Sequence, residues 1–174
     1  RYNTSLHAHA QFAAMVTRLD TYVGEVLAKL KEKGFDKNTL VIFTSDNGPH
    51  MEGGADPDFF GHNAILRGTK RQTHEGGVRV PFIAWGPGMV PAGVVNDHQL
   101  AFYDLMPTFC ELAGVEDYVA KYTNPNKEVD YFDGLSFAKT LTDKEGQDAH
   151  DFLSWEFEET DQVAVRMGDR KMVS

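Results

Sequence analysis

Hydrophobic residues near the start of the chain recur at helical spacing and then give way to an uninterrupted apolar run. Between residues 9 and 33 they lie three or four positions apart, which predicts an amphipathic helix ending at Gly34. These positions are Phe12, Met15, Val16, Leu19, Val23, Val26, Leu27 and Leu30. Residues 40–44 are apolar and β-branched without alternation, which predicts a strand buried on both faces. A helix that leads into a buried strand is the repeating unit of an α/β sheet.

The rest of the chain changes from mixed elements to an antiparallel pattern. The expected elements are a strand at 80–85, an extended piece at 98–100, helices at 102–113 and 136–141, and strands at 152–157, 163–166 and 171–173. Residues 167–170 between the last two strands carry a hairpin signal. Residues 116–133 are polar and predict a surface loop. Cys110 lies on the apolar stripe of its helix, so we assign it to core packing. We therefore expect two units: residues 1–115 from an α/β domain, and residues 116–174 as a loop with a small antiparallel subdomain.

Polar side chains follow the expected buried strand at once. After Ser45 come Asp46 and Asn47, at the end of a strand where open α/β sheets bind ligands. Their oxygen atoms suit Ca²⁺ or Mg²⁺. The alternative is a tight Asn-Gly hairpin turn, but residues 49–57 are too rich in proline and glycine to form the second strand. A long loop here favours a functional site, and His50 is a further candidate to line it.

Composition narrows the possible functions. The chain has 174 residues, of which 41% are hydrophobic and 25% charged, as in an ordinary soluble domain. A net charge of −9 argues against general nucleic-acid binding, although local lysines and arginines can still attract an anionic substrate. No apolar run approaches the length needed to cross a bilayer, so we expect no membrane partner. A single cysteine excludes an internal disulfide.

Three blocks of sequence resemble the second half of a sulfatase of the arylsulfatase family. They are residues 41–48, 66–70 and 75–81, in the family's order and spacing, and the likeness continues at 104–108. The resemblance implies part of an alkaline-phosphatase-like mixed sheet flanked by helices and followed by a small antiparallel C-terminal sheet. It also implies a sulfuric ester hydrolase that is secreted, periplasmic or lysosomal.

The resemblance further assigns roles to individual residues. It implies that Asp46 and Asn47 bind a divalent cation, usually Ca²⁺, and that Lys70 contacts the sulfate as a catalytic and substrate-binding residue. Sulfatases also use a formylglycine made in a Cys/Ser-x-Pro-x-Arg motif. This sequence has no such motif, and its only cysteine, Cys110, is followed by Glu-Leu-Ala. We expect the nucleophile and the other metal ligands in an N-terminal half, so the isolated chain is expected to be inactive.

The sequence leaves other interpretations open. One is a phosphate-ester hydrolase or phosphotransferase of the alkaline-phosphatase superfamily, although Lys70 before the Glu-Gly-Gly block favours sulfate. Another is a catalytically inactive domain that binds a metal or a glycan. For Glu75 and Arg79 we prefer an ion pair that fixes the turn. The expected partners are a sulfated small molecule or glycan, and either the N-terminal half or a second copy of the chain.

Overall fold

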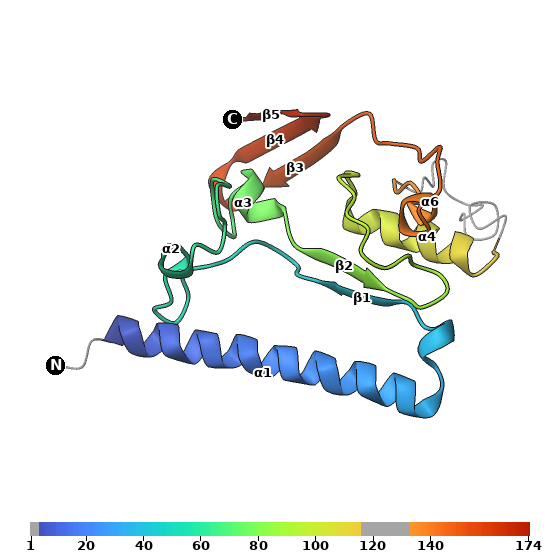
Figure 1. Ribbon diagram of the computed structural model, residues 1–174. Helices are drawn as coiled ribbons and strands as arrows, with labels where there is room; N and C mark the ends of the chain where they lie inside the picture. The colour runs from blue at the N-terminus through green and yellow to red at the C-terminus, as the bar shows by residue number, and fades with distance from the viewer. Residues whose placement is uncertain (1–3, 116–132) are drawn as a thin grey trace, which may run out of the picture.

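The computed structural model describes residues 4–115 and 133–174 (Figure 1). Its helices are α1 (Thr4–Lys33), α2 (Pro57–Phe60), α3 (Glu75–Val78), α4 (Leu105–Leu112) and α6 (Ala138–Leu141). Its strands are β1 (Val41–Thr44), β2 (Phe82–Trp85), β3 (Leu153–Phe157), β4 (Gln162–Met167) and β5 (Arg170–Val173). Single 3-10 turns are η1 (Asp36–Asn38), η2 (Phe102–Asp104) and η3 (Glu158–Thr160). The β1–β2 pair lies between α1 and the three-stranded sheet β3-β4-β5.

Helix α1 confirms the helical periodicity but begins five residues earlier than predicted. It ends as expected, because Gly34 adopts a left-handed conformation with φ of 72° and its N–H bonds to the Lys31 carbonyl at 3.1 Å. Its apolar stripe is largely uncovered, with Met15 65% and Val26 55% exposed. No helix among the described residues is both long and apolar enough to cross a membrane.

Strands β1 and β2 run antiparallel, with Val41 opposite Trp85 and Thr44 opposite Phe82. The prediction that the first strand is buried on both faces is wrong for this chain, because all four β1 residues are only half-buried. In the described residues β1 has one neighbouring strand, β2. Its apolar composition predicts a second neighbouring strand, and its other edge has none there.

The C-terminal sheet confirms the antiparallel pattern. Strands β3 and β4 pair along their whole length, from Leu153 opposite Arg166 to Phe157 opposite Gln162. Strand β5 returns beside β4 through a tight turn, with Met167 opposite Arg170, where the sequence predicts a hairpin. The boundary between the two units at residue 115 stays a prediction.

The core of the described chain is small and centres on Phe137, which is 1% exposed. The ring of Phe82 from β2 meets it edge-on, with the ring centroids 5.7 Å apart. The Thr108 hydroxyl on α4 accepts a bond from the Phe137 N–H at 3.0 Å and donates to the Asp104 carbonyl at 2.6 Å. The predicted helix at 102–113 therefore forms as η2 followed by α4, and it packs on α6.

Two other predicted segments have different outcomes. The extended piece predicted at 98–100 forms no strand. The polar loop predicted at 116–133 lies outside the described residues, except for Asp133.

A buried carboxylate joins three segments of this core. Asp104, 1% exposed, accepts the N–H of Ala101 at 2.7 Å and the N–H of Leu135 at 2.9 Å. The Nε2 of His150 donates to the same carboxylate, 2.8 Å from one oxygen and 3.0 Å from the other. The His150 ring packs edge-on against Tyr103, whose pKa is raised by burial and then by the charges of Asp104 and Asp133.

We predict that Asp104→Ala lowers the free energy of unfolding by about 3 kcal/mol or more, because it leaves buried donors without an acceptor. Urea unfolding followed by circular dichroism measures the loss. The control Asp148→Ala removes an exposed carboxylate and should stay within about 0.5 kcal/mol of the unaltered chain. Equal stability of the two variants would contradict the role given to Asp104.

Candidate functional site

The loop that follows β1 is shaped by short-range hydrogen bonds. The Ser45 hydroxyl donates to the Asn47 carbonyl at 3.0 Å, and the Asn47 side-chain N–H donates to the Gly48 carbonyl at 2.9 Å. The carboxamide nitrogen of Asn47 is thus occupied, while its oxygen remains available as a ligand. Asp46 is exposed and Asn47 is half-buried. The alternative hairpin does not form, because β1 pairs with β2 instead.

Three glycines allow this loop to touch the backbone of α3. The Gly48 N–H donates to the Gly77 carbonyl at 2.9 Å, and the Gly76 N–H donates to the Arg67 carbonyl at 2.8 Å. A Cβ atom on Gly48 would lie 1.8 Å from the Gly76 carbonyl oxygen, and one on Gly76 would lie 2.1 Å from the Gly68 carbonyl oxygen. No side chain fits at either position without moving the backbone.

Lys70 returns to the same place from far along the sequence. Its backbone N–H donates to the Pro49 carbonyl at 2.8 Å, although Lys70 and Asp46 are 24 positions apart. Within residues 4–115 and 133–174, no carboxylate pairs with the half-buried Lys70. The next residue, Arg71, holds a left-handed φ of 71°, a conformation that costs energy for any residue except glycine.

Two other basic residues lie close to Lys70 in the sequence. Arg67 and Arg71 are exposed in the same loop. The pKa of His74 is lowered by burial, and then by the positive charges of Arg67 and Lys171, all of which disfavour its charged form. In a chain with a net charge of −9, Arg67, Lys70 and Arg71 concentrate positive charge in one loop, which suits an anionic ligand.

The ion pair predicted for Glu75 is confirmed, and the ion pair predicted for Arg79 is not. The Glu75 carboxylate bonds to Arg166 at 2.8 Å and to Lys171 at 2.9 Å, and the predicted turn around it is the single-turn helix α3. The prediction for Arg79 is wrong, because its side chain is exposed and pairs with no carboxylate of the described residues.

A contact that the sequence does not predict fixes the long loop to α1. His9, 5% exposed, accepts the Asp56 N–H at 2.9 Å through Nε2 and stacks on Phe59 with the rings 4.0 Å apart. His50 is half-buried, and its Nε2 lies 3.7 Å from a Glu52 oxygen. The sequence does hold one signal for the contact of His9. Phe12 follows His9 by three residues, and on a helix that spacing puts both side chains on one face.

The donor chemistry of the loop fits a hard cation, but the chain supplies few ligands. Among the described residues there is no group of three His, Cys, Asp or Glu side chains placed to hold a metal ion. Ca²⁺ takes six to eight oxygen ligands, so Asp46 and Asn47 can provide only part of such a site.

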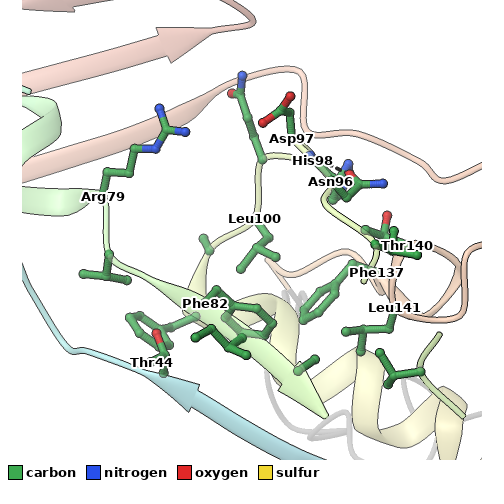
Figure 2. A pocket seen from close by; sticks show the side chains of 18 of the residues that line it. Thr44, Arg79, Phe82, Asn96, Asp97, His98, Leu100, Phe137, Thr140 and Leu141 are labelled. Atoms are coloured by element: carbon green, nitrogen blue, oxygen red, sulfur yellow. Dashed lines mark hydrogen bonds between the residues drawn. The ribbon is translucent and has the colours of Figure 1, made fainter. Parts of the chain in front are cut away.

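A cavity of about 760 Å³ lies elsewhere in the described chain, between β2, the loop at 86–101, α6 and β3. Phe82, Leu100 and Phe137 form an apolar wall, and Arg79 and His98 stand on the polar side (Figure 2). None of the predicted site residues Asp46, Asn47, His50 and Lys70 lines it. The cavity is therefore a separate feature from the loop that carries the candidate site.

The comparison with known families agrees with the three blocks, because the sulfatase family model matches residues 2–115, which contain all of them. The chain belongs to the sulfatase family. Rat steryl-sulfatase is 40% identical over 110 residues, which cover 62% of this chain and 19% of that protein. A sulfatase of Formosa agariphila is 37% identical over 161 residues, which cover 87% of this chain and 27% of that protein.

Solved structures agree with this assignment. Ps i-CgsB in complex with k-i-k-neocarrahexaose superposes with a TM-score of 0.73 at 30% identity, over 96% of this chain and 34% of that one. The predicted alkaline-phosphatase-like fold is confirmed by such sulfatase neighbours. The chain spans between about a fifth and a third of the length of these sulfatases.

We predict that Gly48→Ala destabilises this sulfatase chain by about 2 kcal/mol or more, because the new methyl group would overlap the Gly76 carbonyl. Chemical denaturation measures the change. The matched control is Gly24→Ala on α1, where a Cβ meets nothing within 4 Å, and it should raise stability by about 0.5–1 kcal/mol. A harmless Gly48→Ala would show that the loop and α3 do not touch.

Proposed function

We propose that this chain supplies part of the cation and sulfate site of a sulfuric ester hydrolase. The observation that carries the proposal is the bond from the Lys70 N–H to the Pro49 carbonyl, which puts Lys70 beside the loop of Asp46 and Asn47. The bond between Gly48 and Gly77 brings the third block to the same place. Residues that serve one reaction have to converge in this way, whereas a solvated lysine has no reason to return to the loop.

Asp46 and Asn47 would hold Ca²⁺, or Mg²⁺, through the carboxylate and carboxamide oxygens. Bound there, the cation would orient and polarise the sulfate group. The hydrogen bond from the Asn47 side-chain nitrogen to the Gly48 carbonyl orients the carboxamide and supports this assignment. His50 would lie at the edge of the same site.

Lys70 would place its ammonium group against the sulfate oxygens on the leaving side. A compact positive charge stabilises the negative charge that develops there in the transition state. Arg67 and Arg71 add to the positive field around it and would help to draw in the substrate.

Other parts of the reaction need residues outside these 174. A hydrated formylglycine from an N-terminal half would supply the nucleophile for S–O cleavage. The same half would supply further metal ligands and cover the exposed stripe of α1 and the free edge of β1. A second copy of the chain is the alternative cover, and it would appear as a dimer in solution.

The substrate would be a sulfated small molecule or glycan. Ps i-CgsB was solved with a neocarrahexaose, and its similarity over nearly the whole chain favours a glycan. By family resemblance, we place the enzyme in a secreted, periplasmic or lysosomal compartment.

We predict that Lys70→Ala lowers turnover of a sulfate ester at least about 10²-fold in the complete enzyme, the scale for loss of one preorganised charge-stabilising group. Hydrolysis of 4-nitrophenyl sulfate measures turnover, and 4-nitrophenyl phosphate tests the phosphatase alternative. The exposed Lys37→Ala on η1 is the control and should retain normal turnover. Normal turnover in Lys70→Ala would remove that residue from the site, and a preference for the phosphate would overturn the sulfatase assignment.

We predict that Asp46→Ala raises the dissociation constant of Ca²⁺ about tenfold or more in the complete enzyme, because a charged ligand is lost. Isothermal titration calorimetry after removal of metal with EDTA measures the constant. Asp58→Ala removes an exposed carboxylate from α2 and serves as the control, with affinity unchanged. Equal affinities in both variants would exclude Asp46 as a ligand.

A further inference from the structure

The C-terminal sheet reaches the candidate site through one carboxylate. We propose that Glu75, Arg166 and Lys171 form a charged brace that positions α3 and, through it, the loops that carry Asn47 and Lys70. The role in catalysis rests on the proposed function, while the mechanical role rests on the contacts alone. None of the three is proposed to touch the substrate, so they are positioning residues.

Both oxygens of the Glu75 carboxylate are used in the brace. One lies 2.8 Å from Arg166 Nη1, and the other lies 2.9 Å from Lys171 Nζ. The three side chains are only 23%, 20% and 11% exposed, respectively, so water screens them less than it screens a surface ion pair.

The sheet needs this carboxylate for an electrostatic reason. Arg166 on β4 and Lys171 on β5 are directly opposite each other in the strand register. Like charges in that relation destabilise a sheet. Glu75 compensates both charges, and the Lys171 ammonium also lies 4.1 Å from the ring centre of Trp155 on β3. All three strands thus contribute to holding one residue of α3.

A second bond ties the same segment to the sheet. The Thr73 N–H, two residues before Glu75, donates to the Gln162 side-chain oxygen on β4 at 3.2 Å. Thr73 is 3% exposed, so this bond is shielded from water.

From α3 the restraint passes to the site through backbone bonds. The Gly76 N–H donates to the carbonyl of Arg67, which lies three residues before Lys70. The Gly77 carbonyl accepts the N–H of Gly48, which is next to Asn47. A displacement of α3 would therefore move both loops. Misplacement of reacting groups by about 1 Å can cost on the order of 10²-fold in rate.

The brace also crosses the limit of the family match. The sulfatase family model covers residues 2–115, whereas Arg166 and Lys171 lie beyond it. The part of the chain outside that match would therefore contribute to the geometry of the site.

Hydrogen exchange measured by NMR on the 174-residue chain tests the mechanical role without any assay of activity. Glu75→Gln keeps the size of the side chain and removes its charge. The amides of Gly48 and Lys70 should exchange about tenfold faster or more, while the amides in the middle of α1 should change less than twofold. Glu32→Gln, which removes a carboxylate paired with Lys29 on the exposed face of α1, is the control and should leave all of them unchanged.

Kinetics in the complete enzyme test the role in catalysis. Glu75→Gln should lower kcat about tenfold per folded molecule, with KM changed less than twofold. Adding Arg166→Met to Glu75→Gln should lower kcat no further, because both changes break the same link. If Glu75→Gln does not fold, Lys171→Met, which keeps the bond between Glu75 and Arg166, replaces it in both experiments.

Each outcome decides one proposal. Unchanged exchange at Gly48 and Lys70 overturns the brace, and unchanged kcat overturns its role in catalysis. If the unaltered enzyme hydrolyses no sulfate ester, the proposed function fails, while the exchange data still decide whether the brace exists.

Discussion

The arrangement of the candidate site depends on a place where two backbones meet with no room for a side chain. Gly48 and Gly76 approach so closely that a single added carbon would overlap a carbonyl oxygen. That approach lets the loop after β1 bond directly to α3, and it leaves Lys70 within reach of Pro49. Since each loop is long, the entropy of holding them together has to be offset by contacts of this kind.

Elsewhere in the described chain, polar contacts shielded from water join segments that are far apart in the sequence. The apolar core around Phe137 is small, so distant segments are also joined by Asp104 with His150 and by Glu75 with two cations. Such contacts are directional, and they fix the relative position of segments more strictly than apolar burial alone does. For a site built from separate loops, accurate placement matters more than a large gain in stability.

Local patterns in the sequence predict the elements well, because periodicity and turn chemistry are properties of neighbouring residues. The helix at 9–33 and the hairpin at 167–170 are confirmed for this reason. The bond between Asp104 and His150 spans 46 positions, and no local pattern encodes it. The composition of β1 anticipates neighbours on both sides, whereas the described chain supplies one. Similarly, the three blocks locate the candidate site, but only the fold shows that Glu75 faces the C-terminal sheet.

The opposed cations of β4 and β5 have a consequence for protein engineering. If the hairpin of this chain were grafted onto another sulfatase without an acidic residue at the place of Glu75, two unmatched positive charges would face each other in the graft. Conversely, an α3 that carried Glu75 beside a foreign sheet would leave a carboxylate without its counterions. The unit of exchange in a chimaera is therefore α3 together with the C-terminal sheet, even though these segments lie far apart along the chain.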